Sequence, residues 1–300
     1  QEINTLTEFG WHNDMQTFLI GDRLYHKDGT VRKVLLGGYA RDFQSFFPEP
    51  KGTVEGYAQG LNCLYNREGM EILQYVIGSS FGSLLTPLCD TDYKGVIMAV
   101  IGNDTAKGKT TVCWASLYAF GNADKMTINT EQGSTDNARY SRMAAFKNIP
   151  LLMDELTNID KDEFSKLAFA VASGSDKARM YVNSKSKTGL GNKQPGEWRM
   201  NPLVTANTDL HGLLASQRGN TEAEAVRLIQ IDIESYKVPK IDDISEVKTA
   251  REQIELNMGS AGDAYIKYLV THLDEVIAKV KRWGNKIETD IPNPKLRFYR

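Results

Sequence analysis

The chain has 300 residues, of which 41% are hydrophobic and 25% are charged, and its formal net charge is −2. These values are ordinary for a globular protein of one large or two small domains, and they exclude a protein that is basic overall. Any contact with nucleic acid must therefore come from a local basic patch. The three scattered cysteines argue against zinc and disulfides, and no apolar run reaches the roughly 18 residues of a membrane span. We therefore expect a cytoplasmic protein without a membrane contact.

The first part of the chain, residues 1–66, is predicted to be rich in β-structure. Short strand-like runs occupy residues 17–20, 23–26 and 31–36, and a Lys-Asp-Gly turn precedes the third run. A helical segment is predicted over residues 67–94, because apolar side chains within it recur at helical spacing. We expect this segment to be a linker or collar.

The third part of the chain, residues 95–240, is predicted to be a P-loop NTPase core. Residues 96–101 form a continuous apolar run, which is typical of a strand buried on both faces of a parallel sheet. Three further apolar strands, separated by helical stretches, are predicted at residues 149–153, 202–206 and 228–233. This alternation predicts an α/β doubly wound core. Residues 241–300 are predicted to form a helical tail with a solvated charged face.

A loop rich in glycine and lysine follows the first core strand and precedes a predicted helix over residues 109–120. Backbone N–H groups of such a loop face the phosphates of a nucleotide, here ATP, while Lys109 would bind the β- and γ-phosphates and Thr110 would ligate Mg²⁺. Five residues separate Gly102 from Gly108, where the usual motif has four. Either Asn103 replaces the first glycine or the loop has one extra residue. The predicted nucleotide-binding residues are Gly102, Asn103, Asp104, Thr105, Ala106, Lys107, Gly108, Lys109, Thr110 and Thr111.

Two adjacent carboxylates, Asp154 and Glu155, end the second apolar strand of the core. Asp154 is predicted to hold Mg²⁺, directly or through water, and Glu155 to polarise the water that attacks the γ-phosphate. Neighbouring residues of an extended chain point to different sides, so the two carboxylates can take different roles. The alternative is an acidic helix N-terminus without a catalytic role. The phosphate loop earlier in the chain favours the catalytic interpretation.

Asn207 ends the third apolar strand, where its amide can bind both the γ-phosphate and the attacking water. The alternative is an Asx turn that closes the strand. A motor built as a ring also needs an arginine that reaches the ATP of the next subunit. Arg227, directly before the last strand, is our first candidate for this role, and Arg218 is the second.

A basic segment lies between the second and third of these motifs. Residues 176–199 contain six basic and two acidic residues, a local net charge of +4 in a chain whose net charge is −2. Residues 180–182 and 197–200 could pair as a hairpin around a turn-rich tip. Lysines at such a tip bind phosphates without reading sequence, although a solvated surface loop is the alternative. The candidate DNA-binding residues are Lys177, Arg179, Lys185, Lys187 and Lys193.

The order of these motifs resembles that of the superfamily 3 helicases and their AAA+ relatives. More closely, the chain resembles a family of phage and plasmid proteins known as domain of unknown function 927. The matching motifs are Gly10-Trp11-His12 with Phe18 and Gly21-Asp22; Gly102 with Gly108-Lys109-Thr110-Thr111; Pro150-Leu151 with Asp154-Glu155-Leu156; Ala172-Ser173-Gly174 with Lys177-Ala178-Arg179; Trp198-Arg199; Val226-Arg227-Leu228 with Ile231-Asp232-Ile233; and Leu296-Arg297-Phe298-Tyr299-Arg300.

The resemblance implies the ATPase module of a phage or plasmid replication protein, often joined to a primase part. It also implies a hexameric ring with ATP at the subunit boundaries, the basic hairpin facing the pore, and a primase or polymerase partner. If the protein is phage-encoded, its place is the cytoplasm of a bacterial host. Since the chain starts at Gln1 and stops at Arg300 within an apparently structured stretch, we expect it to be a fragment of a longer protein.

The function expected from these motifs is that of an ATP-dependent motor, a helicase module that translocates on single-stranded DNA with Mg²⁺ and ATP. The first alternative is an AAA+-like ATPase that loads or remodels protein partners without moving on DNA. A nucleotide-binding scaffold without turnover is a second alternative, which the presence of Lys109, Thr110, Asp154 and Glu155 disfavours. A small-molecule kinase is weaker, because no lid-like arginine cluster follows the core.

Overall fold

The central feature of the structure, a computed structural model, is a five-stranded parallel sheet in the order β11-β5-β10-β7-β6. The structure describes residues 5–89, 94–103, 107–129, 136–176, 179–182, 190–193, 196–215 and 226–290. All five residues of β5 are buried, as the apolar run predicts for a strand covered on both faces. The sheet strands are β5 (Ile97–Ile101), β6 (Thr127–Asn129), β7 (Leu152–Asp154), β10 (Leu203–Ala206) and β11 (Leu228–Asp232).

The strand order places β5 between β10 and β11, so the chain leaves β5 for the far edge of the sheet and returns towards it. In the register, Ala206 of β10 and Asp232 of β11 both lie beside Ile101 at the end of β5. The carboxyl ends of these strands therefore meet at one edge of the sheet. Open α/β sheets bind ligands at this edge, where the strand order reverses.

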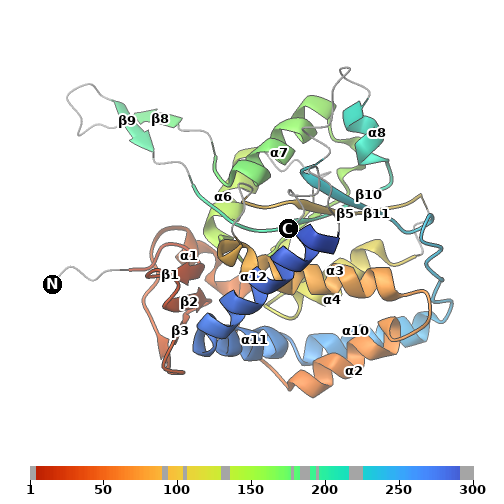
Figure 1. The fold of residues 1–300 in the computed structure, drawn as a ribbon, viewed down its shortest axis with the longest axis horizontal. Coiled ribbons are helices and arrows are strands. Elements are labelled where there is room, and N and C mark those ends of the chain that lie inside the picture. The colour runs from red at the N-terminus through yellow and green to blue at the C-terminus, as the bar shows by residue number, and fades with distance from the viewer. Residues whose placement is uncertain are drawn as a thin grey trace.

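Helices cover both faces of the sheet (Figure 1). In that view α3 and α4 lie below the sheet, and α6, α7 and α8 lie above it. Asp160 caps α7 by accepting hydrogen bonds from the N–H groups of Asp162 and Glu163, and the left-handed Gly174 ends the helix. The helices are α3 (Glu71–Gly82), α4 (Lys109–Leu117), α5 (Ala123–Met126), α6 (Asp136–Phe146), α7 (Lys161–Ser173) and α8 (Leu210–Ala215), with short 3₁₀ helices η2 (Ser83–Leu88) and η3 (Leu156–Asn158).

The N-terminal part forms a small antiparallel sheet that packs on the core. The N–H of Phe9 donates to the carbonyl of Ala145 at 2.8 Å, and that of Trp11 donates to Oδ1 of Asn148 at 2.9 Å. The side chains of this region join the same buried hydrophobic cluster as the central sheet. Its elements are β1 (Gly10–His12), β2 (Thr17–Ile20), β3 (Arg23–His26), β4 (Val31–Lys33), α1 (Gly38–Phe43), η1 (Gln44–Phe46) and α2 (Val54–Tyr65).

Three helices form the C-terminal part, namely α10 (Ile244–Leu256), α11 (Ser260–Thr271) and α12 (Leu273–Asp290). α10 packs along α2, where Gly60 allows close approach: a Cβ there would lie 2.7 Å from Cγ1 of Ile254. α11 packs against β2 and β3 and so joins the two ends of the chain. In the described residues, no helix is long and apolar enough to cross a lipid bilayer.

The predicted fold class is confirmed: a parallel α/β core, a β-containing N-terminal part and a helical tail. The sequence did not predict β6, because it has only three residues, of which Ile128 alone is buried. The predicted pairing of the basic hairpin is wrong. β8 (Arg179–Val182) pairs with β9 (Leu190–Lys193), whereas residues 197–200 belong to the body, since Trp198 is buried and stacks on Tyr140 with ring centroids 6.0 Å apart.

Candidate nucleotide-binding site

The predicted phosphate loop begins where β5 ends and closes at the first turn of α4. Gly102 has φ of 150°, and a Cβ on it would lie 2.7 Å from Cγ1 of Ile233. Gly108, the N-cap of α4, has φ of 78°. Both positions therefore need glycine. Any side chain at position 102 would be strained, which favours Gly102 as the first glycine of the motif. The loop then has one residue more than usual, and Asn103 does not replace the first glycine.

Lys109 is buried, with 6% of its surface exposed, at the start of α4. Its ammonium group donates to the carbonyl of Gly102 and, at 2.7 Å, to Oδ1 of Asn207. A buried charge is stable only when polar groups surround it, as these oxygens do. Two of the predicted site residues, which come from β5–α4 and from the end of β10, are thus brought into direct contact.

Thr110 and Asp154 also meet at this edge of the sheet. The Thr110 hydroxyl donates to Oδ1 of Asp154 at 3.1 Å, and the hydroxyl of Thr205 on β10 donates to the same oxygen. A hydroxyl and a carboxylate are the hard oxygen ligands that Mg²⁺ accepts beside substrate phosphates. Among the described residues no cluster of three or more His, Cys, Asp or Glu side chains forms a metal cage. The pair therefore fits an ion that is held mainly by nucleotide and water.

The hydrophobic surroundings of Asp154 include Cys113 on α4, which is fully buried. Burial raises the pKa of the Cys113 thiol, and the negative charge of Asp154 raises it further. The thiol therefore stays neutral at the pH of a cell and behaves as an apolar side chain behind the site. It is not expected to bind a metal ion.

Glu155 departs from the extended geometry that the sequence suggested. Its φ of 59° and ψ of 54° are left-handed, so the chain turns sharply directly after β7. The turn is held because the Glu155 N–H donates to Oγ1 of Thr205 at 3.1 Å. A left-handed turn at Glu155, and not the alternation of an extended strand, therefore sets the place of its carboxylate relative to that of Asp154. Such a conformation is costly for a residue other than glycine, and it is typical of functional sites.

The loop after β10 is fixed by β11. Oε1 of Gln230 accepts hydrogen bonds from the N–H groups of Leu210 at 2.8 Å and His211 at 3.1 Å, and its Nε2 donates to Asp209 at 2.8 Å. This bond from Gln230 is the main reason why the pKa of Asp209 lies below its usual value. Asn207 therefore lies at the start of a loop that follows β10 and is hydrogen-bonded to β11.

Arg227 lies away from this cluster. It precedes β11, and its carbonyl accepts from the N–H of Ile97 at the beginning of β5. Its guanidinium carbon lies 4.2 Å from the ring centre of Phe169 on α7. With a rise of about 3.3 Å per residue, this end of β5 is roughly 16 Å from the end that carries the phosphate loop. Arg227 therefore does not belong to the site of its own chain.

The other predicted site residues are described only in part. The N–H of Asn103 donates to Oε1 of Glu234, which follows β11, at 2.9 Å. Lys107 and Thr111 lie in the loop and in α4. For Arg179 and Lys193 the backbone is described within β8 and β9. The predicted residues outside the described part of the chain are Asp104, Thr105, Ala106, Lys177, Lys185, Lys187 and Arg218.

Sequence reasoning missed three residues of the site, namely Thr157, Thr205 and Glu234. Thr205 carried a usable signal, because it lies two residues before Asn207 in a strand and so shares a face with it. Thr157 and Glu234 carried none, because a hydroxyl or a carboxylate after a strand is common in any turn.

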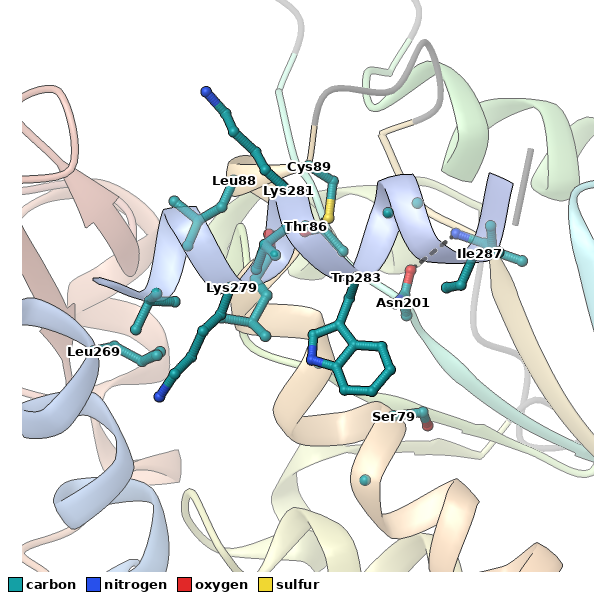
Figure 2. A pocket seen from close by; sticks show the side chains of 18 of the residues that line it. Ser79, Thr86, Leu88, Cys89, Asn201, Leu269, Lys279, Lys281, Trp283 and Ile287 are labelled. Carbon is teal, nitrogen blue, oxygen red and sulfur yellow. Dashed lines mark hydrogen bonds between the residues drawn. The ribbon is translucent and has the colours of Figure 1, made fainter. Parts of the chain in front are cut away.

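A large pocket lies at the opposite edge of the sheet, with a volume of about 920 Å³. It is lined by α3, η2, α11 and α12 and by Val96 and Asn201, which precede β5 and β10. Figure 2 shows Trp283 of α12 beside this pocket together with Asn201, whose Oδ1 accepts a hydrogen bond from the Val96 N–H at 3.1 Å. Because it adjoins the amino ends of the strands, this pocket is separate from the candidate nucleotide site.

Comparison with known families gives a match over residues 1–189 to the family described as a domain of unknown function, DUF927. The chain belongs to the DUF927 family. The matched region includes the phosphate loop and the acidic pair. The family resemblance expected from the sequence motifs is thus confirmed, whereas a phage or plasmid origin stays a prediction. No curated protein matches this DUF927 protein.

A solved structure described as "SCCmec type IV Cch - active helicase" aligns with 99% of this DUF927 chain at 15% identity and a TM-score of 0.71. The alignment covers 53% of that protein, so the chain spans about half of its length. At this identity the likeness shows a shared fold. Two structures of NtrX from Brucella abortus, one of them in complex with ADP, align over 72% and 76% of the chain at 16% and 15% identity. Their TM-scores of 0.34 and 0.36 are too low to show a shared fold.

Proposed function

We propose that the chain is the ATPase core of a nucleic-acid motor, the helicase module of a phage or plasmid replication protein. It hydrolyses ATP with Mg²⁺ at the subunit boundaries of a hexameric ring and moves along single-stranded DNA. One observation carries the proposal: the ends of β5, β7 and β10 bring Lys109, Asp154, Glu155 and Asn207 together behind a phosphate loop. This constellation supports phosphoryl transfer to water.

The residues divide the chemistry among themselves. Lys109 and the N–H groups at the start of α4 bind the phosphates and balance their negative charge. Thr110 and Asp154 would hold Mg²⁺, which would supply positive charge against the phosphates. Glu155 accepts a hydrogen bond from the attacking water and orients it towards the γ-phosphate. Asn207 exchanges its contact with Lys109 for contacts with the γ-phosphate and this water.

The place of Arg227 is compatible with a ring. Because this arginine stands at the opposite end of the strands from Lys109, it can act on ATP only in another subunit. An arginine supplied in trans stabilises charge in the transition state and makes hydrolysis depend on the neighbour. Arg218 remains the second candidate for the same role.

The DNA contact is assigned to the basic segment. The hairpin of β8 and β9 stands away from the body of the protein in Figure 1. Lys177, Arg179, Lys185, Lys187 and Lys193 in and around it supply positive charge in a chain whose net charge is −2. Basic side chains on a projecting hairpin suit contact with phosphates that does not read sequence. The shared fold with a protein described as an active helicase supports the same assignment.

Translocation is tested by displacement of streptavidin from the end of biotinylated single-stranded DNA. The purified chain should displace streptavidin with ATP and Mg²⁺, and should fail with a non-hydrolysable ATP analogue or as Lys109→Ala. ATP hydrolysis without displacement from either DNA end would overturn the motor and favour an ATPase that remodels protein partners.

A further inference from the structure

The side chain of Thr157 joins the turn after the acidic pair to the residue that follows β10. Its hydroxyl oxygen accepts a hydrogen bond from the N–H of Asn207 at 2.9 Å. The same hydroxyl donates to Oε2 of Glu155 at 3.4 Å. Thr157 is half-buried in η3, directly between the predicted general base and the predicted γ-phosphate sensor.

The Thr157 hydroxyl acts as an acceptor in one of these hydrogen bonds and as a donor in the other. A threonine hydroxyl has one proton to donate, and its oxygen accepts from other donors. Here the oxygen accepts from the N–H of Asn207, and the proton is donated to the Glu155 carboxylate, which has no proton to give in return.

We infer that Thr157 is a positioning residue that couples Asn207 to Glu155, so that the carboxylate is oriented for the attacking water only when Asn207 is seated. The inference rests on the proposed ATPase function. A second contact supports it, because the carbonyl of Thr157 accepts a hydrogen bond from Oγ1 of Thr208 at 3.3 Å. The start of the loop after β10 and η3 therefore move together, and a displacement of Asn207 by the γ-phosphate is passed to Glu155.

Lys109 contacts the side chain of Asn207, whose N–H is bonded to Thr157. In the structure the Asn207 side chain is held by the Lys109 ammonium at 2.7 Å. A γ-phosphate competes for this ammonium, so its arrival releases the amide and shifts the strand end to which Thr157 is bonded. Without the Thr157 hydroxyl, other rotamers of the Glu155 carboxylate would become accessible.

The inference is tested with Thr157→Val, which keeps the shape and removes the hydroxyl, and with Thr157→Ser, which keeps the hydroxyl. Thr86→Val is the matched control, because Thr86 is also half-buried and bonds the carbonyls of Ser83 and Arg199 at the other edge of the sheet. For each variant kcat, KM and the affinities for a non-hydrolysable ATP analogue and for ADP with aluminium fluoride are measured.

We expect Thr157→Val to lower kcat by about 10- to 100-fold, as misplacement of a catalytic group does. Affinity for ADP with aluminium fluoride should fall in parallel, while affinity for the ATP analogue changes less than about twofold, because only the transition state uses the oriented carboxylate. Thr157→Ser should restore most of kcat, and Thr86→Val should behave as wild type. Thr157→Ala tests the same hydroxyl if the valine variant does not fold.

Two results would overturn the inference. The first is a kcat of Thr157→Val within about twofold of wild type. The second is an equal loss of affinity for the ATP analogue and for ADP with aluminium fluoride, which would show a structural role of the threonine in the pocket. A wild-type chain without ATP hydrolysis would instead refute the proposed function itself, so the two failures are distinguishable.

Discussion

The ammonium group of Lys109 donates to Oδ1 of Asn207 at 2.7 Å, across the gap between the start of α4 and the end of β10. This contact joins the residue predicted to bind phosphate with the residue predicted to sense it. Both ends are supported by the backbone, because the ammonium also reaches the carbonyl of Gly102 and the Asn207 N–H is bonded to Thr157. The side chains of Lys109 and Asn207 are therefore held in place by contacts within the protein.

Replacement of Glu155 by glutamine separates binding from hydrolysis. Glu155→Gln keeps the size and the left-handed turn but removes the basic carboxylate, so turnover should fall by about 10²- to 10⁴-fold. Nucleotide affinity should change little, because Lys109 and the loop remain. Steady-state hydrolysis and binding of a fluorescent ATP analogue measure the two effects. Turnover equal to that of wild type would remove Glu155 from the mechanism.

Removal of the Thr205 hydroxyl should destabilise the acidic turn. The side chain is 1% exposed, donates to Asp154 and accepts from the Glu155 N–H. Thr205→Val leaves that N–H without its acceptor, so the free energy of unfolding should fall by about 1–3 kcal/mol. Urea unfolding measures the change, and hydrolysis should fall with it.

Thr17→Val is the matched control for Thr205→Val. Thr17 on β2 is also buried, but in the described part of the chain its hydroxyl has no hydrogen-bond partner. Its replacement should leave the free energy of unfolding unchanged or raise it slightly, because an unsatisfied polar group is removed. Equal losses in both variants would contradict the role assigned to the Thr205 hydroxyl.

The strands of the core were predictable because long apolar runs leave few alternatives. β5 is such a run and β10 is likewise buried throughout, whereas β11 also contains Gln230 and Asp232. The three-residue β6 is defined by its pairing with β7, which no local pattern encodes. The hairpin partner was misassigned for a related reason: Trp198 suits a strand, but it is used to fill the core beside Tyr140.

The site residues were predictable where chemistry restricts the residue type. A phosphate loop needs glycine and lysine, and a magnesium ligand needs a carboxylate, so Lys109 and Asp154 could be named as candidates from the sequence alone. The left-handed turn at Glu155 was not, because it depends on a hydrogen bond to Thr205, fifty residues later in the chain. Tertiary contacts of this kind override the local preference for an extended chain.

A mixing experiment tests the trans role of Arg227. Lys109→Ala and Arg227→Ala should each be inactive alone. Mixed in equal amounts they should regain activity, because about a quarter of the boundaries in randomly assembled rings then combine an intact lysine with an intact arginine. Hydrolysis is measured against the mixing ratio. An active Arg227→Ala variant, or a mixture that stays inactive, would exclude this arginine as the trans-acting group.

The basic hairpin is tested by a triple variant, Lys185→Ala with Lys187→Ala and Lys193→Ala. Affinity for single-stranded DNA should fall, and the slope of log affinity against log salt should become shallower by about 0.7 for each phosphate that the variant no longer binds. Basal hydrolysis should be unchanged, because the hairpin stands away from the site in Figure 1. Fluorescence anisotropy over a salt series measures the slope.

A control for the hairpin variant removes equal charge elsewhere. Three exposed lysines outside the hairpin, replaced together by alanine, should leave the salt slope at its wild-type value; these are Lys51, Lys248 and Lys281. A hairpin variant that binds DNA as the wild type does would assign this segment to a protein partner. That outcome would support the remodelling alternative.

The central claim is that ATP hydrolysis at this site is coupled to DNA, and turnover with and without saturating single-stranded DNA tests it most directly. We predict strong stimulation of the wild-type chain by DNA, weaker at high salt, and no hydrolysis in either condition for Lys109→Ala. Basal hydrolysis that depends on Lys109 but is unchanged by DNA across the salt series would contradict the account and leave an ATPase whose partner is a protein.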